Sequence, residues 1–241
     1  IRSGGTAIKL AREGHEVHFV SVSNGNLGHY SMPRAALAAR RYGETQAAAK
    51  VAGITAYHVL SHSDCDIYAT RENRDEMVRH IRNIDPDVVI SHRTCDYHVD
   101  HRNVGQIVLD AAYLLGLPLL CPEVPICSRN PVFGYFYDTF TNAGAMRPDA
   151  AVSIDDVYDR KLHMLDCQKS QFYEWLAWEK MRGNAREPEK LPDLANWPWE
   201  KRAEWLDKGW GARYINAANS ARETLAAVYG TEKAATVRYA E

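Results

Sequence analysis

Two histidines and an aspartate stand close together in the segment His98-Val99-Asp100-His101, shortly after the apolar run at residues 87–90. A buried strand, then ligand-capable side chains, then an amphipathic helix is typical of open α/β sheets, where the chemistry lies at the carboxyl ends of strands. Neutral imidazole is a good zinc ligand, and two histidines three residues apart approach one another in a helical turn. The segment therefore predicts a metal-assisted hydrolytic site.

His101 is the better candidate for a metal ligand, because the N-terminus of a helix favours a neutral imidazole. His98 paired with Asp100 would be held in one tautomer and could act as an acid or as an electrostatic stabiliser beside the metal. The alternative interpretation is structural: Asp100 would cap the helix and the histidines would only occupy a loop. One imidazole cannot hold zinc alone, and no HExxH, second HxH or cysteine pair completes the site.

The chain has 241 residues, of which 46% are hydrophobic and 25% charged, which fits one large domain or one domain with an appendage. A net charge of -2 with both signs interspersed argues against a nucleic-acid partner, and no apolar run is long enough to span a membrane. The 5 cysteines are scattered and contain no CxxC pair, which argues against disulfides and a thiolate zinc site. We expect a cytoplasmic protein.

Helices and strands alternate in the first half of the chain, which predicts βαβ units and a parallel sheet. Because the chain opens on a helix, we expect a preceding strand to belong to the intact fold. Glycines, proline and capping residues set the boundaries. The expected elements are a helix ending at Gly14, a strand at 17–22, a helix at 34–52 closed by Gly53, a strand at 57–60, a helix capped by Thr70 or Asn73, a strand at 88–90 and a helix from His101 to Gly116.

After Pro118 the pattern changes to short extended pieces at 133–140 and 150–154, followed by helices at about 155–181 and 213–229. We predict a Rossmann-like three-layer α/β fold with a mostly parallel sheet, lacking its first strand in this sequence, over residues 1–180. Residues 181–241 are expected to form a Trp-rich loop and a C-terminal helix packed on it. The tryptophans could line a sugar-binding surface, pack within this appendage or form an oligomer interface; they are Trp197, Trp199, Trp205 and Trp210.

Several motifs, in order, resemble the PIG-L/LmbE-like family of zinc-dependent N-acetylglucosaminyl deacetylases over most of residues 1–180. The segment from Tyr97 to Arg102 resembles the family's second motif, HxDH followed by Arg, with Val99 where many relatives have proline. The other matching segments are Ser3-Gly4-Gly5-Thr6, Val20-Ser21-Val22-Ser23-Asn24-Gly25, Arg41-Tyr42-Gly43-Glu44 followed by Ala47-Ala48-Ala49, Leu60 to Asp64, and Asp155 to Leu162 with Ser170-Gln171.

The resemblance implies a zinc-dependent hydrolase, with other divalent metals as alternatives, that removes an N-acetyl group from an amino sugar or glycoconjugate. It makes His101 a zinc ligand. It makes His98 the group that stabilises the oxyanion or protonates the leaving amine, with Asp100 as its orienting partner. The family's first motif, His-Pro-Asp-Asp, carries two further zinc ligands and the general base, and the resemblance places it just before Ile1, ahead of this sequence.

The resemblance also implies substrate contacts from Arg41, with Arg40 as an alternative, and from Asp64. Without it, the arginines could equally be a solvated helix face and Asp64 a turn former. His29 is a further candidate, because it lies in the loop after the strand at 17–22, near the expected pocket mouth.

Two other functions are alternatives to the deacetylase. A nucleotide-binding Rossmann protein requires G-x-G-x-x-G, which Gly4-Gly5 does not match. A non-catalytic sugar-binding or scaffold relative that has lost its metal site stays open, as does a homo-oligomer.

Overall fold

The structure, a computed structural model, describes residues 2–180, 187, 189 and 191–241. The chain forms two compact units, the first made of residues 1–64 and 147–241 and the second of residues 65–146. The boundary predicted after residue 180 adjoins residues outside the described part. The division into a domain at 1–180 and an appendage at 181–241 therefore stays a prediction.

Each unit contains a two-stranded parallel sheet. In the first unit β1 (His18–Ser23) pairs with β2 (Ala56–His62), and the register shifts near the end of β1. In the second unit β3 (Val88–Ser91) pairs in register with β4 (Val132–Tyr135). Each pair is joined through a helix, α2 (Arg34–Ala52) or α4 (Val99–Leu114), as parallel pairing requires. The predicted mixed α/β fold with parallel strands is confirmed.

The early helices end where the sequence predicted. After α1 (Gly4–Arg12) the chain turns at Gly14, whose φ is +92°, and α2 is closed by Gly53, whose φ is +76°. Glycine adopts such positive φ values without steric cost. The core of the first unit contains Ile8, Leu165 and Phe172, all almost completely buried. None of the described helices is long and apolar enough to cross a membrane.

The late helix predicted at 155–181 is wrong as a continuous element. It consists of a 3₁₀ turn (Asp155–Val157), α5 (Tyr158–Asp166), a π-helical turn (Ser170–Trp175) and α6 (Leu176–Lys180). The break has a physical cause, because the Ser170 N–H donates to Glu44 Oε1 at 2.9 Å and the Ser170 hydroxyl to Glu44 Oε2 at 2.6 Å. Glu44 lies on α2, so a contact distant in sequence takes this backbone amide out of the helical ladder.

The C-terminal helix predicted at 213–229 is also divided, since the backbone at Ala221 leaves the helical conformation. The predicted extended segment at 150–154 contributes a single antiparallel bridge between Ser153 and Ala240. Trp205 donates to the Phe172 carbonyl at 3.3 Å. Trp210 belongs to the core cluster of the first unit, and Trp197, Trp199 and Trp205 pack against it. The elements of this region are a 3₁₀ turn at Leu194–Asn196, α7 (Trp199–Leu206), a π-helical turn at Asp207–Gly211, α8 (Ala212–Ser220), α9 (Arg222–Tyr229) and α10 (Thr231–Thr236).

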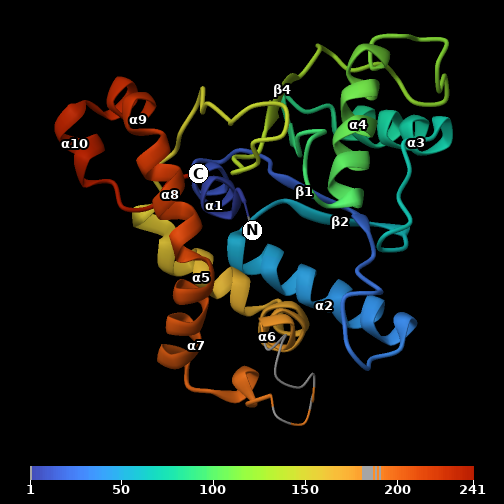
Figure 1. Ribbon diagram of the computed structural model, residues 1–241. Coiled ribbons are helices and arrows are strands. Elements are labelled where there is room, and N and C mark those ends of the chain that lie inside the picture. The colour runs from blue at the N-terminus through green and yellow to red at the C-terminus, as the bar shows by residue number, and fades with distance from the viewer. Residues whose placement is uncertain (1, 181–186, 188, 190) are drawn as a thin grey trace. The chain divides into compact units, whose positions relative to one another are not determined.

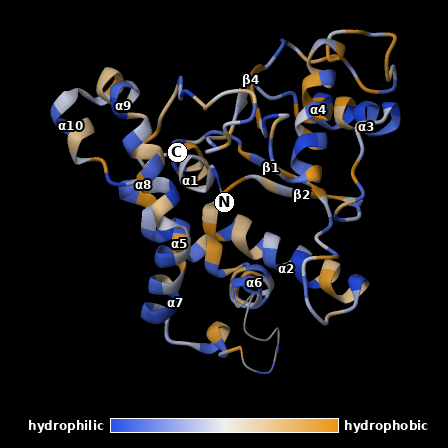
Figure 2. Cartoon of the chain, viewed as in Figure 1, coloured by the Kyte–Doolittle hydropathy of each residue, from blue (hydrophilic) through white to orange (hydrophobic). Residues whose placement is uncertain are grey.

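In the second unit α3 (Arg71–Ile84) packs beside α4, as Figure 1 shows. The Thr70 hydroxyl caps α3 by accepting the Asn73 N–H at 3.3 Å, so of the two predicted caps Thr70 is confirmed. Most of α3 is hydrophilic (Figure 2), and its buried side includes Met77 and Ile81. In α4, a Cβ on Gly105 would lie 2.6 Å from the carbonyl oxygen of His92. Only glycine lets α4 approach the segment that follows β3 so closely.

Candidate active site

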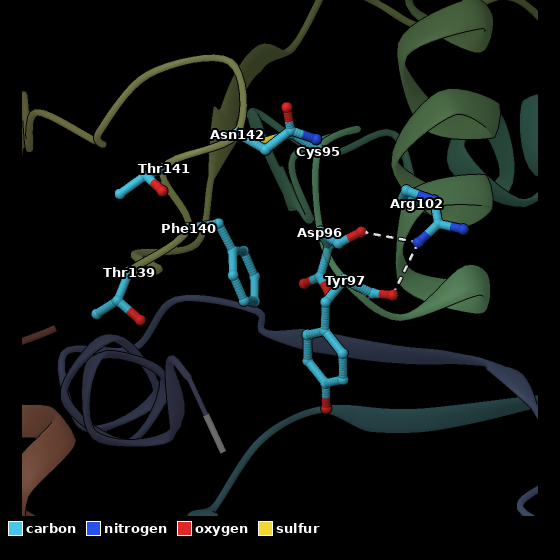
Figure 3. Close-up of a pocket in the computed structure, with 8 residues that line it drawn as sticks. All are labelled: Cys95, Asp96, Tyr97, Arg102, Thr139, Phe140, Thr141 and Asn142. Carbon is cyan, nitrogen blue, oxygen red and sulfur yellow. Dashed lines mark hydrogen bonds between the residues drawn. The ribbon is translucent and has the colours of Figure 1, made fainter.

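The loop between β3 and α4 carries the predicted chemistry and is held in a defined shape. Asp96 is 2% exposed, and its Oδ1 accepts the His98 N–H at 2.9 Å. Arg102, from the first turn of α4, donates to the carbonyl oxygens of Asp96 at 3.0 Å and Tyr97 at 2.8 Å (Figure 3). The loop is thus fixed by the side chain of Asp96 and by that of Arg102 from α4.

His98, not Asp100, caps α4. The helix begins at Val99, and the Asp100 N–H donates to His98 Nδ1 at 3.2 Å. The structural alternative in which Asp100 is the cap is therefore wrong, because its amide is one of the donors that need capping. An acceptor at Nδ1 leaves the proton of a neutral ring on Nε2. His98 therefore presents an N–H donor on the far side of its ring.

Asp100 is 7% exposed, and its Oδ2 accepts the Cys65 N–H at 2.8 Å. Its other oxygen, Oδ1, is buried and has no hydrogen-bond partner among the residues that the structure describes. A buried carboxylate oxygen without a donor is costly, and a bound cation is one way to compensate it. Asp100 contacts His98 through its backbone amide, which donates to His98 Nδ1.

His101 lies in a cluster of imidazoles beside Asp96. Its ring stacks on His92 with centroids 4.2 Å apart and on His98 at 4.6 Å. Its Nδ1 lies 3.2 Å from Asp96 Oδ2. This distance places a carboxylate behind the imidazole, as is found behind many metal-ligating histidines, although the pair does not meet hydrogen-bond geometry. The orientation is consistent with the predicted ligand role of His101.

Two of these residues were missed as functional groups from the sequence. Asp96 lies outside the motif from Tyr97 to Arg102, five positions before His101. His92 directly follows β3, which is the position where the carboxyl end of a strand exposes side chains. Because both residues closely follow the end of β3, their position in the sequence could have indicated that they belong to the site.

The donors of this loop fit a divalent transition metal. One donor atom each from Cys65, His98 and Asp100 lie within 4.8 Å of one another. The group contains sulfur, nitrogen and oxygen donors of the kind that bind zinc, and it includes the buried Asp100, whose Oδ1 has no hydrogen-bond partner among the described residues. The identity of the metal stays a prediction.

A pocket of about 470 Å³ opens beside the loop (Figure 3). The rings of Tyr97 and Phe140 lie side by side in it, with centroids 5.5 Å apart. The segment that carries Phe140 is held by Arg93, which donates to both carboxylate oxygens of Asp138, at 2.8 and 2.5 Å, and to the Phe140 carbonyl at 3.0 Å. The hydrogen bond to Asp138 raises the pKa of Arg93 above its usual value. The complete lining is Cys95, Asp96, Tyr97, Arg102, Thr139, Phe140, Thr141 and Asn142.

In the first unit, the structure brings together Arg41 and Asp64, with Arg41 NH1 3.8 Å from Asp64 Oδ2. Arg41 also donates to the carbonyl oxygens of Gly25 at 2.9 Å and Gly28 at 2.6 Å, and Asp64 Oδ2 accepts the Leu27 N–H at 2.9 Å. Burial lowers the pKa of Arg41, and the nearby carboxylates oppose that shift. Both side chains therefore shape the loop after β1, and their predicted contact with substrate stays a prediction.

His29 and Arg40 share one carboxylate, that of Glu174. His29 Nε2 lies 2.9 Å from Glu174 Oε2, and Arg40 donates to both oxygens of Glu174 at 2.8 and 2.5 Å. Burial alone would raise the pKa of Glu174, but the hydrogen bonds from Arg40 and His29 hold it below the usual value. His29 Nδ1 accepts the backbone N–H groups of Ser31 and Met32. The sequence did not indicate Glu174.

The sequence is similar to those of enzymes with known activities. The chain is 30% identical over 187 residues to the diacetylchitobiose deacetylase of Thermococcus kodakarensis, which covers 73% of this chain and 67% of that protein. It is 26% identical over 185 residues to the 4-oxalmesaconate hydratase of Pseudomonas putida, covering 72% of this chain and 70% of the hydratase. Residues 1–112 match the PIG-L family, described as GlcNAc-PI de-N-acetylase. The chain belongs to the PIG-L family, as the motifs indicated.

Solved structures show the same fold. The N,N'-diacetylchitobiose deacetylase of Pyrococcus horikoshii superposes with a TM-score of 0.71 at 23% identity, covering 100% of this chain and 76% of that one. The 4-carboxy-2-hydroxymuconate hydratase of Pseudomonas putida has a TM-score of 0.69 at 20% identity, covering 99% and 87%. Deacetylases and hydratases therefore share this architecture, and the chemistry has to be argued from the site.

Proposed function

We propose that this protein is a metal-dependent N-deacetylase, with zinc as the metal, that hydrolyses the acetamide of an N-acetylated amino sugar or glycoconjugate. The proposal depends on one observation, which is that the ring nitrogens of His98 and His101 make different contacts. His101 places Nδ1 3.2 Å from Asp96 Oδ2, where a carboxylate can orient a metal-ligating ring, whereas His98 uses Nδ1 as an acceptor and keeps its proton on Nε2. One ring is prepared to bind a cation and the other to donate a proton.

A bound divalent cation would polarise the acetyl carbonyl and lower the pKa of water. The His98 Nε2–H can donate a hydrogen bond to the developing oxyanion or a proton to the departing amine. Asp96 contributes to both histidines, because one oxygen holds the His98 backbone and the other faces the His101 ring. The family resemblance assigns the general base and two further ligands to the His-Pro-Asp-Asp motif.

The pocket favours a neutral sugar over the anionic substrate of a hydratase. Among its lining residues the one cation is Arg102, whose NH1 is engaged by two backbone carbonyls. Its other members offer hydroxyl and amide groups beside the rings of Tyr97 and Phe140. Aromatic faces and hydrogen-bonding side chains suit a sugar ring, and the sugar-deacetylase relative points to the same class.

The test compares two variants of the protein with the wild type. We expect wild type to release free amine from N,N'-diacetylchitobiose or N-acetylglucosamine and to contain zinc by elemental analysis. His98→Ala should keep its zinc and lose about 10² to 10³ in turnover, the usual cost of removing an oxyanion stabiliser. His101→Ala should lose both zinc and turnover.

Equal zinc loss from the two variants would overturn this division of roles. A wild-type protein that binds acetylated sugar yet releases no amine, with or without added metal, would identify a non-catalytic sugar-binding relative. Cytoplasmic location and a homo-oligomeric state are proposed from the sequence alone.

A further inference from the structure

Cys65 occupies an unusual position in the second unit. Its φ is +63°, in the left-handed region that residues with a side chain rarely adopt. Cys65 is exposed to solvent, and its backbone N–H donates to Asp100 Oδ2 at 2.8 Å. This hydrogen bond joins the start of the segment before α3 to the first turn of α4, although the two residues are 35 positions apart. The contact holds a thiol against the buried carboxylate.

Three different donors meet at this point. The sulfur of Cys65, a ring nitrogen of His98 and an oxygen of Asp100 lie within 4.8 Å of one another. Independently, Asp100 is more than nine-tenths buried, and its Oδ1 has no hydrogen-bond partner among the described residues. Ligand atoms of a tetrahedral zinc site lie about 3.3 to 3.8 Å apart, from bond lengths of about 2.0 to 2.3 Å. Small side-chain rotations, chiefly of the exposed cysteine, would bring the three atoms to this separation.

We infer that Cys65, His98 and Asp100 form an auxiliary binding site for a thiophilic divalent cation such as Zn²⁺ or Cd²⁺. The site is distinct from the metal position that His101 serves, because none of its three donors is His101. A thiolate with an imidazole and a carboxylate selects zinc and cadmium over Mg²⁺ or Ca²⁺, which prefer oxygen ligands alone. The exposed side of Cys65 gives the cation an entry path.

A cation bound at this site interferes with the two other roles of His98, which are to cap α4 through Nδ1 and to donate a hydrogen bond from Nε2. A cation at Nδ1 displaces the Asp100 N–H that this nitrogen accepts, and a cation at Nε2 moves the ring proton to Nδ1, where it opposes the same N–H. In both cases the cap of α4 is lost, and a cation at Nε2 also removes the Nε2–H donor, whereas a cation at Nδ1 leaves the ring proton on Nε2. Excess zinc therefore inhibits the enzyme, a consequence that rests on the proposed deacetylase function.

Cadmium binding tests the site without reference to activity, because a thiolate bound to Cd²⁺ gives an ultraviolet charge-transfer absorption. Wild-type protein titrated with CdCl₂ should develop this absorption with saturation at one thiolate site. Cys65→Ser should abolish it, whereas the matched control Cys95→Ser should retain it. Asp100→Asn should raise the apparent Kd about tenfold or more, and His101→Ala should leave the absorption in place.

A second substitution, Cys65→Gly, guards against a folding artefact, because glycine accepts the left-handed backbone while removing the sulfur. It should lose the absorption and keep the wild-type circular dichroism spectrum. Absorption that survives in both Cys65 variants overturns the auxiliary site. Inhibition by excess zinc, expressed relative to each variant's own activity, should be weaker in Cys65→Ser. A failed amine assay refutes the deacetylase and leaves the cadmium result standing.

Discussion

Replacing Asp96 by asparagine should weaken metal binding without unfolding the loop. The amide oxygen can continue to accept the His98 N–H, now 2.9 Å from Asp96 Oδ1, so the loop keeps its hydrogen bond. The amide nitrogen then takes the place of Oδ2, 3.2 Å from His101 Nδ1. Because that nitrogen is a donor, Nδ1 has to accept and the ring proton moves to Nε2. The lone pair directed at the metal is lost.

The expected magnitude follows from the role of the carboxylate behind a ligand. Loss of such a partner lowers metal affinity about 10- to 100-fold, which corresponds to about 1.4 to 2.7 kcal/mol. The assay is competition for zinc with a chromogenic chelator, combined with ¹⁵N NMR of the histidine rings to identify the tautomer. Asp138→Asn is the matched control, because Asp138 is equally buried in the same unit but pairs with Arg93.

The control should leave the zinc Kd unchanged. If Asp96→Asn binds zinc as tightly as wild type, the tautomer argument is refuted. The same holds if both aspartate variants weaken zinc binding equally, since the effect would then come from general loosening of the unit.

Three further perturbations test other parts of the structure. Gly105→Ala should destabilise the fold by about 1 to 3 kcal/mol in chemical denaturation, because its Cβ would lie 2.6 Å from the His92 carbonyl oxygen, whereas Gly116→Ala, with its nearest neighbour at 3.9 Å, should have little effect. Phe140→Ala should raise KM for an acetylated sugar about five- to tenfold with little change in kcat, as expected from loss of roughly 1 kcal/mol of ring contact, and a change confined to kcat would contradict this. Burial lowers the pKa of Lys161 from 10.5 to about 8, so between these values the unfolded chain binds a proton that the folded chain has released. The free energy of unfolding should therefore rise with pH across that interval, and Lys161→Met should flatten the rise.

Much of the secondary structure was predictable because its signals are local. Gly14 and Gly53 end helices where a left-handed residue is required, and Thr70 caps a helix through an amide three positions away. The alternation of strand and helix indicated parallel pairing before any contact was known. The family motifs were likewise readable as short segments in a fixed order, and the family assignment was confirmed.

The late helix shows why local signals failed elsewhere. Residues 155–181 have helical spacing, yet Ser170 gives its amide to Glu44, 126 positions earlier. A similar uncertainty affected the site itself. The sequence offered Asp100 as the cap of the helix, and the backbone geometry makes His98 the cap.

The order of residues along this chain was sufficient to establish the family, the α/β class and the loop that holds the histidines, because periodicity, caps and motifs involve near neighbours. Folding decided which atoms of that loop are available for chemistry. It placed Cys65 against Asp100 and Phe140 beside Tyr97, residues that are remote in sequence. The reason is that the direction of a lone pair and the cost of a buried charge depend on surroundings that exist only once distant segments have packed together.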